Sequence, residues 1–411
     1  MSRPQHRKVR IVCVSDTHNQ TPKLPKGDVL IHAGDLTNHG SIPELRKIVG
    51  WLENADFQAK IVIAGSNHDI TLDSDFYREH GAYTHPQNVQ NPEECLRLLA
   101  ESPTITYLNH ESATVQLTSA DGSYTRFKVF GSPWSPKLPT GHGKWAFQYE
   151  GEKATKIWEA IPEHRSEQAV KLWDAIPLDT DIVITHTPPK NHCDSTYVNS
   201  GRAGCEALRR ALWRVRPKLA VCGHMHEGRG AERIRWSLDM PQVRYMEEST
   251  EIWTDPGLGS NKQSLVDLTI KSREPLDSYD SPVDQLSLNN RASFSPSSPE
   301  QSTPVPDDIA ALMKADPDTH HVRAHLHRRR KHSTLRGLAE RSAAEKGWTE
   351  SDEGLSRLDD HDAAALEGRM GRRETCVVNA AIKARSWGTV GTKFLNKPII
   401  VDIDLPVWQE T

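Results

Sequence analysis

Short runs of apolar residues, rich in Val and Ile and with little alternation, recur along the first two thirds of the chain. Uninterrupted runs of this length are typical of strands that are buried on both faces of a sheet. Stretches between some of them, such as Ile42–Asn54 and Gly204–Arg216, predict helices. The alternation of strands and helices favours an α/β layered fold. The strand-like runs are residues 9–14, 28–33, 60–64, 127–131, 181–185 and 218–223.

The character of the sequence changes after residue 270. Ser281–Pro306 is rich in Ser and Pro, and a basic, His-rich stretch follows at His320–His332. Such composition cannot bury enough apolar surface to offset the entropy of ordering, so residues 271–373 are predicted to be a largely disordered insertion. Strand-like runs return within 374–408 and need a sheet to join. We therefore predict one folded domain made of 9–270 and 374–408, since loop-closure entropy grows slowly with length.

Composition narrows the class of protein. Hydrophobic residues make up 36% of the 411 residues, which agrees with a segment that does not pack, and the net charge of −4 provides no basic field. Nucleic acid is therefore not expected as a partner. No run approaches the roughly 20 apolar residues of a membrane helix, and the N-terminal apolar run is too short for a signal peptide. The six cysteines form no CxxC pair and indicate no disulfide framework. These features predict a cytoplasmic protein, with a nuclear location left open by the basic stretch.

Side chains that can bind metal ions follow five of the apolar runs. In open α/β sheets the ligand crevice lies beyond the carboxyl ends of the strands, so these side chains can converge. Asp16 and His18 are two residues apart, as are His224 and His226, and each pair faces one way in extended chain. Histidine, carboxylate and amide ligands suit Mn²⁺, Fe or Zn²⁺. The five motifs are Asp16-Thr17-His18, Gly34-Asp35, Gly65-Ser66-Asn67-His68-Asp69, His186 and Gly223-His224-Met225-His226.

This order of motifs resembles the calcineurin-like metallophosphoesterase superfamily. The longer stretches GDVLIHAGDLTNHG, FGSPWSP, THTPP and VCGHMHEGRG resemble the fetal-brain-type metallophosphoesterase-domain proteins, which are similar to class III cyclic nucleotide phosphodiesterases. The resemblance covers residues 9–270 and the runs near 377–402, but not the insertion. It implies a four-layered α/β/β/α sandwich, in which 9–270 is the first part of the catalytic domain and 374–408 supplies its closing strands.

The resemblance also implies a reaction and its residues. A hydroxide that bridges two divalent cations would attack the phosphorus of a small phosphodiester, with cyclic nucleotides among the candidate substrates. His68, oriented by Asp69, would stabilise the transition state or protonate the leaving oxygen. The implied ligands are Asp16, His18 and His226 for the first metal, Asn67, His186 and His224 for the second, and Asp35 bridging both.

One motif departs from the family pattern, in which Gly, Asn and His are contiguous. Here Ser66 stands between Gly65 and Asn67, which makes the turn one residue longer. The extra residue either moves Asn67 off the metal and His68 away from the substrate, or is absorbed as a bulge by Gly65 and Ser66. Our hypothesis is that the site still assembles, because every ligand type is retained. Removal of Ser66 should then change activity only modestly.

Several alternatives stay open on the sequence alone. The same superfamily includes phosphomonoesterases and nucleases, and fold does not decide among them. A metal-binding scaffold with little turnover has the extra Ser66 as its one support. Trp134 and Trp145–Phe147 either line a substrate groove or pack in the core, and His39 and His142 lie in loops that can approach the site. The basic stretch is either a solvated patch or a surface for anionic or protein partners.

Overall fold

The computed structural model describes residues 6–137, 144–149, 167–196, 202–238, 247–278, 371–383 and 395–408. The predicted disorder of the insertion falls mostly outside these residues, as does His142. Among the described helices, none has the length and apolar content that crossing a bilayer requires.

All described strands except β7 and β8 form one 13-stranded sheet that is folded into two halves. The first half contains β13-β15-β1-β2-β3-β4 and the second contains β12-β11-β14-β10-β9-β6-β5. In the first half the bounds are β1 His6–Val14, β2 Val29–Ala33, β3 Ala59–Ile63, β4 Thr106–Tyr107, β13 Ser264–Asp267 and β15 Ile399–Trp408. In the second half they are β5 Glu111–Thr118, β6 Tyr124–Ser132, β9 Ile182–Thr185, β10 Leu219–Cys222, β11 Gly230–Trp236, β12 Glu247–Ile252 and β14 Glu374–Asn379.

The last strand of the chain connects the two halves. β15 pairs antiparallel with β1 from Cys13↔Ile399 to His6↔Pro406, and its end pairs with β6 at Val407↔Thr125. β14 lies between β10 and β11, parallel to the first and antiparallel to the second. Both strands that follow the insertion therefore lie inside the sheet rather than at its edges.

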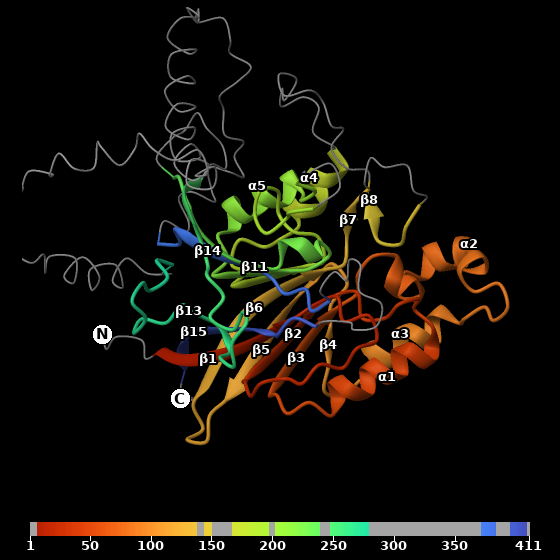
Figure 1. Cartoon of the computed structure of the whole chain (residues 1–411), viewed down its shortest axis with the longest axis horizontal. Helices are drawn as coiled ribbons and strands as arrows, with labels where there is room; N and C mark the ends of the chain where they lie inside the picture. Colours follow the sequence, from red (N-terminus) through yellow and green to blue (C-terminus); the bar gives the residue numbers. More distant parts are fainter. Residues whose placement is uncertain are drawn as a thin grey trace, which may run out of the picture. The chain divides into compact units, whose positions relative to one another are not determined.

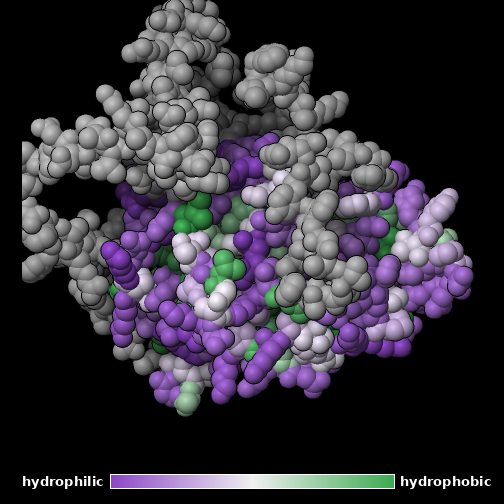
Figure 2. All heavy atoms as spheres, viewed as in Figure 1, coloured by the Kyte–Doolittle hydropathy of each residue, from purple (hydrophilic) through white to green (hydrophobic). Residues whose placement is uncertain are grey.

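Both faces of the first half are buried, which explains why its strands show no polar alternation. On β1, Ile11 and Cys13 point into a core that also contains Phe127 and Val129 of the second half. Val12 and Val14, which alternate with them, point into a second core beneath the helices. The sheet halves thus pack face to face, and the space-filling view shows a mostly hydrophilic outer face with small apolar patches (Figure 2).

Helices cover the two outer faces. α1 Ile42–Glu53, α2 Ser74–Thr84 and α3 Pro92–Ala100 lie over the first half, and α4 Glu167–Asp174 and α5 Glu206–Val215 lie over the second (Figure 1). The four-layered α/β/β/α prediction is confirmed. Two short helices, η1 Asn67–Leu72 and η4 His226–Gly228, follow β3 and β10, and a small two-stranded sheet consists of β7 Ser135–Pro136 and β8 Gln148–Tyr149.

The start of α1 is tied to the loop that follows β1. Glu44, in the first helical turn, accepts hydrogen bonds from the backbone N–H groups of Ser41 and His39 at 3.2 and 3.1 Å. These bonds satisfy N–H groups near the start of the helix that have no partner within it. The same carboxylate accepts a hydrogen bond from the side chain of Asn19, one residue after His18. One helix cap thereby fixes a loop that leads to the candidate metal ligands.

Candidate metal centre

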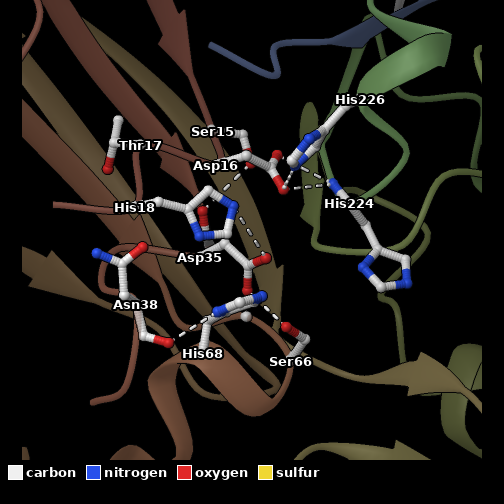
Figure 3. Close-up of polar contacts among 12 residues, drawn as sticks. Ser15, Asp16, Thr17, His18, Asp35, Asn38, Ser66, His68, His224 and His226 are labelled. Carbon is white, nitrogen blue, oxygen red and sulfur yellow. Dashed lines mark hydrogen bonds and ion pairs between the residues drawn. The ribbon is translucent and has the colours of Figure 1, made fainter. Parts of the chain in front are cut away.

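The predicted ligands converge at the carboxyl ends of parallel strands (Figure 3). β1, β2 and β3 are parallel neighbours, and so are β6, β9 and β10, so the loops that leave them meet at one edge. Asp16 and His18 follow β1, Asp35 follows β2 and His68 follows β3. From the second half, His186 follows β9, and His224 and His226 follow β10.

The ligand atoms gather in three groups, within each of which they lie no more than 4.8 Å apart. Asp35 has one oxygen toward each half of the protein, with Oδ1 3.4 Å from His186 Nε2 and Oδ2 3.7 Å from His18 Nε2. A carboxylate placed in this way can bridge two cations. The groups are Asp16, His18 and His226; His18, Asp35 and His68; and Asp35, His186 and His224.

Buried nitrogen atoms in this site have no protein partner, which is the observation that tests the fit of a metal. Neither ring nitrogen of His18 has a hydrogen bond, nor does Nε2 of His186. His186 Nδ1 donates to the Ala33 carbonyl at 2.9 Å, so its Nε2 keeps a lone pair on the side of Asp35. Leaving a buried polar atom unpaired costs about 1–3 kcal/mol, whereas a carbonyl that accepts from the other ring nitrogen is typical of metal-binding histidine. The residues therefore fit divalent cations.

The electrostatics also favour cations. Burial lowers the pKa of His18 and of His224 to about 4, so both rings are neutral, the form that binds metal. Burial alone would raise the pKa of Asp16, but the hydrogen bond from His226 and the nearby histidines outweigh it and hold the pKa well below its usual range. The pKa of Asp35 is lowered in the same way, mainly by His186, against the opposing effect of burial.

The backbone at the ligands is held in an uncommon conformation. Asp16, His18, Asp35 and His224 have φ of 53°, 44°, 52° and 65°, values that non-glycine residues adopt mainly where the surroundings impose them. His224 N donates to both carboxylate oxygens of Asp16, at 3.1 and 3.0 Å. Gly223 permits this approach, because a Cβ there would lie 2.3 Å from Asp16 Oδ2.

Asp69 is predicted to orient His68, but the two side chains have different hydrogen-bond partners. Asp69 is buried and accepts hydrogen bonds from the backbone N–H groups of Leu36, Thr37 and Gly65 at 2.9–3.0 Å, so it joins the loops after β2 and β3. Burial and the charge of Asp35 raise the pKa of Asp69 to about 7, against the effect of these donors. The ring of His68 is oriented by the Asn38 carbonyl, 2.9 Å from Nδ1 (Figure 3).

The extra residue in the third motif changes what faces Asp35. Ser66 Oγ donates to Asp35 Oδ1 at 2.6 Å. Asn67, the predicted ligand, instead accepts a hydrogen bond on Oδ1 from Ala146 N at 3.4 Å. The structure thus brings Asp16, His18, Asp35, His68, His186, His224 and His226 together, and turns the Asn67 oxygen toward the loop at 144–149.

The aromatic and loop residues considered from the sequence lie at the side of this centre. The rings of Trp134 and Phe147 pack edge to face at 6.2 Å, against the core under α1 and α3. His39 is exposed and lies 3.5 Å from Glu44. Packing and helix capping account for these three side chains.

Asn379, at the end of β14, is a supporting residue that the sequence interpretation missed. Its fully buried amide donates to Met225 O at 2.8 Å and to Cys193 O at 3.0 Å. It therefore fixes the loop that carries His224 and His226. The signal was available, because Asn379 ends an apolar run as the ligands do, but the run was interpreted only as a closing strand.

His192 is a further buried histidine, and its partners are two carboxylates. Both ring nitrogens of His192 contact carboxylates, Nδ1 at 2.9 Å from Glu232 and Nε2 at 3.0 Å from Glu247, so both nitrogens carry protons. Arg209 donates to both oxygens of Glu247 at 2.7 Å, including the one that His192 contacts. Burial lowers the pKa of His192, but the two glutamates raise it more, so the net pKa lies above the ordinary 6.5.

This raised pKa predicts a pH-dependent contribution to stability. A group with a raised folded-state pKa stabilises fully below its unfolded value, here 6.5, and the contribution disappears as the pH rises through the folded value. The free energy of unfolding of the wild-type protein should therefore exceed that of His192→Gln by a larger amount at about pH 6 than at about pH 9. Urea denaturation of both chelated proteins at the two pH values measures this, and a difference that is independent of pH would contradict it.

An α/β/β/α sandwich whose strand ends gather aspartates and histidines in this way defines a metallophosphoesterase. The family model described as calcineurin-like phosphoesterase matches residues 9–228, more than half of the chain, and the chain belongs to that family. The resemblance inferred from the motifs is confirmed.

One of the similar curated proteins is named for the same domain. Metallophosphoesterase domain-containing protein 1 of Homo sapiens is 36% identical over 235 residues, 54% of this chain and 61% of that protein. UPF0046 protein K07C11.7 of Caenorhabditis elegans is 32% identical over 54% of this chain and 65% of that protein. An Emericella nidulans protein described as probable rhamnogalacturonate lyase C is 42% identical over 56% of this chain, but only 18% of that protein is matched. The chain thus spans less than two thirds of each of these relatives.

Among solved structures, TT1561 of Thermus thermophilus aligns with 14% identity and a TM-score of 0.28, over 53% of this chain and 82% of that one. A similarity at this level does not bear on function.

Proposed function

We propose that this chain is a dinuclear metal-dependent phosphodiesterase that hydrolyses small phosphodiesters, with cyclic nucleotides among its candidate substrates. The observation that supports it best is the position of Asp35, whose two oxygens face separate groups of histidines. Mn²⁺, Fe and Zn²⁺ all suit this ligand set. When bound, two such cations neutralise charge on the phosphoryl group and make a water molecule a stronger acid.

The protein's own contribution to the reaction is a histidine, His68, that is held beside the ligands and can protonate the leaving oxygen. Because a carbonyl can only accept, the contact with Asn38 fixes the proton of His68 on Nδ1 and leaves Nε2 free to act toward the site. His68 is half-buried and its ring packs edge to face on His18 at 4.4 Å, so it is accessible beside the ligands. With a second proton on Nε2, in the imidazolium form, His68 can protonate a leaving oxygen and keep its Nδ1 hydrogen bond to Asn38.

A nucleophilic side chain is not needed for this reaction. All six cysteines are buried. Burial raises the pKa of Cys222, the cysteine that precedes the Gly-His-Met-His motif, so its thiol stays protonated. Direct attack by water is consistent with these properties.

Turnover of two chromogenic substrates tests the proposal. Protein stripped with chelator should be inactive, and added Mn²⁺ should restore hydrolysis of bis-p-nitrophenyl phosphate in preference to p-nitrophenyl phosphate. Asp402→Asn is a matched control, because Asp402 is a buried carboxylate that pairs with Arg10 at 2.7 Å, away from the site. Preference for the monoester would replace the diesterase assignment, and metal binding without turnover of either substrate would favour a scaffold.

A further inference from the structure

The turn after β3 has a conformation that side-chain packing alone does not explain. Ser66 has φ of 34° and ψ of −158°, outside the regions that residues with a Cβ normally occupy. Such a conformation persists only where the surrounding structure imposes it, and it is concentrated at functional sites. Ser66 is also almost fully buried, with 2% of its surface exposed. A specific contact of the Ser66 hydroxyl is therefore expected to hold the turn in this conformation.

That contact is with the carboxylate of Asp35, which belongs to two of the three groups of ligand atoms. Ser66 Oγ lies 2.6 Å from Asp35 Oδ1. Asp35 Oδ1 in turn lies 3.4 Å from His186 Nε2. The hydroxyl therefore approaches Asp35 from the side of the group formed with His186 and His224. Figure 3 shows Ser66 directed toward Asp35 from the loop below it. The hydroxyl proton is given to Asp35, which leaves the oxygen lone pairs available.

Asn67 is engaged elsewhere. Its Oδ1 accepts from Ala146 N at 3.4 Å, and Ala146 is itself fully buried within the loop at 144–149. The next residue of that loop is also fixed, because Phe147 N donates to Asp73 at 2.9 Å. With the added residue in the motif, the neutral oxygen that faces Asp35 is the hydroxyl of Ser66 and not the amide oxygen of Asn67.

We propose that the hydroxyl of Ser66, and not the amide of Asn67, is the neutral oxygen ligand of the cation held by Asp35, His186 and His224. This rests on the proposed dinuclear site. A hydroxyl is a hard, neutral oxygen donor that suits Mn²⁺. The other cation would be held by Asp16, His18 and His226, and Asp35 Oδ2 lies 3.7 Å from His18 Nε2 beside that group. That position would therefore have one more charged ligand, Asp16. The two positions therefore differ in affinity, and the one completed by Ser66 is the weaker.

Calorimetric titration of chelated protein with Mn²⁺ tests the assignment without relying on turnover. Ser66→Ala should weaken only the lower-affinity Mn²⁺, by about 10–100-fold as for loss of a supporting ligand. Asn67→Ala is the matched neighbour and should keep both affinities. Loss of the weaker site in Asn67→Ala, an equal loss in both variants, or a wild-type protein that binds a single Mn²⁺ would each overturn the proposal.

A change of donor atom provides a test that does not depend on weakened folding in Ser66→Ala. Ser66→Cys places a soft thiolate at the same position, which should increase the preference for Cd²⁺ over Mn²⁺ and add sulfur-to-Cd²⁺ charge-transfer absorption in the ultraviolet. Asn67→Cys should show neither change, and the reverse pattern would overturn the proposal. If wild-type protein binds two Mn²⁺ in this way but hydrolyses no ester, the proposed function fails while the ligand assignment stands.

Discussion

Asp35→Asn should remove the carboxylate that links the two groups of metal ligands. Diester turnover should fall by on the order of 10³-fold, comparable to removal of a single strong transition-state contact. Asp35 is the one residue whose two oxygens face separate histidine groups among the described residues, at 3.4 and 3.7 Å. An asparagine keeps the shape but removes the negative charge and one oxygen ligand. The predicted result is the loss of at least one bound Mn²⁺ per chain.

Thermal unfolding separates this effect from simple misfolding. A ligand that binds only the folded protein raises its stability in proportion to the logarithm of the free ligand concentration. Added Mn²⁺ should therefore raise the melting temperature of wild type and of Asp402→Asn, and raise that of Asp35→Asn much less. The pKa of Asp35 is lowered in the folded protein, so its charge stabilises the fold, and the chelated Asp35→Asn protein should be less stable than chelated wild type. The quantity to compare is therefore the increase in melting temperature that Mn²⁺ produces in each protein. An Asp35→Asn protein with two tightly bound Mn²⁺ would contradict the bridging role.

Asn379→Ala should impair the same centre from a distance. Its amide donates to Met225 O and Cys193 O and accepts from Ala381 N at 3.1 Å, all within the buried interior. Truncation removes the Asn379 donor from the Cys193 carbonyl and the acceptor from Ala381 N, at a cost of about 1–3 kcal/mol each. The Met225 carbonyl keeps the hydrogen bond from Gly228 N at 2.9 Å but loses its tie to β14. Because Met225 lies between two ligands, Mn²⁺ affinity should fall by about 10–100-fold, as for other supporting residues.

Thr375→Val on the same strand is the control for this variant. Thr375 is fully buried and accepts a hydrogen bond from Trp236 Nε1 at 3.0 Å, away from the loops that carry the ligands. It should lower stability and leave Mn²⁺ affinity unchanged. If Asn379→Ala loses only stability and keeps its Mn²⁺ affinity and turnover, Asn379 has no positioning role.

The sequence predicted those features of the fold and site that depend on local patterns. Asp16, Asp35 and His186 each closely follow a strand, so a run of apolar residues was enough to place them at one edge of a sheet. The layered architecture followed from the same runs and from the family resemblance.

What the sequence did not predict depends on contacts between distant segments. The direction of the Ser66 and Asn67 side chains is set by Asp35 and Ala146, from two other loops, and no local pattern encodes it. The connection of the two sheet halves by β15 depends on its register with β1, as in the pair Arg10↔Asp402, whose members are 392 positions apart. Asn379 was within reach of the same rule that found the metal ligands.

Anomalous scattering of Mn²⁺ in crystals of the wild-type protein would test the dinuclear centre itself. Two peaks are predicted, one on each side of the Asp35 carboxylate. One should lie among Asp16, His18 and His226, and the other should lie beside His186, His224 and the hydroxyl of Ser66. A single peak, or peaks that do not share Asp35, would contradict a dinuclear centre.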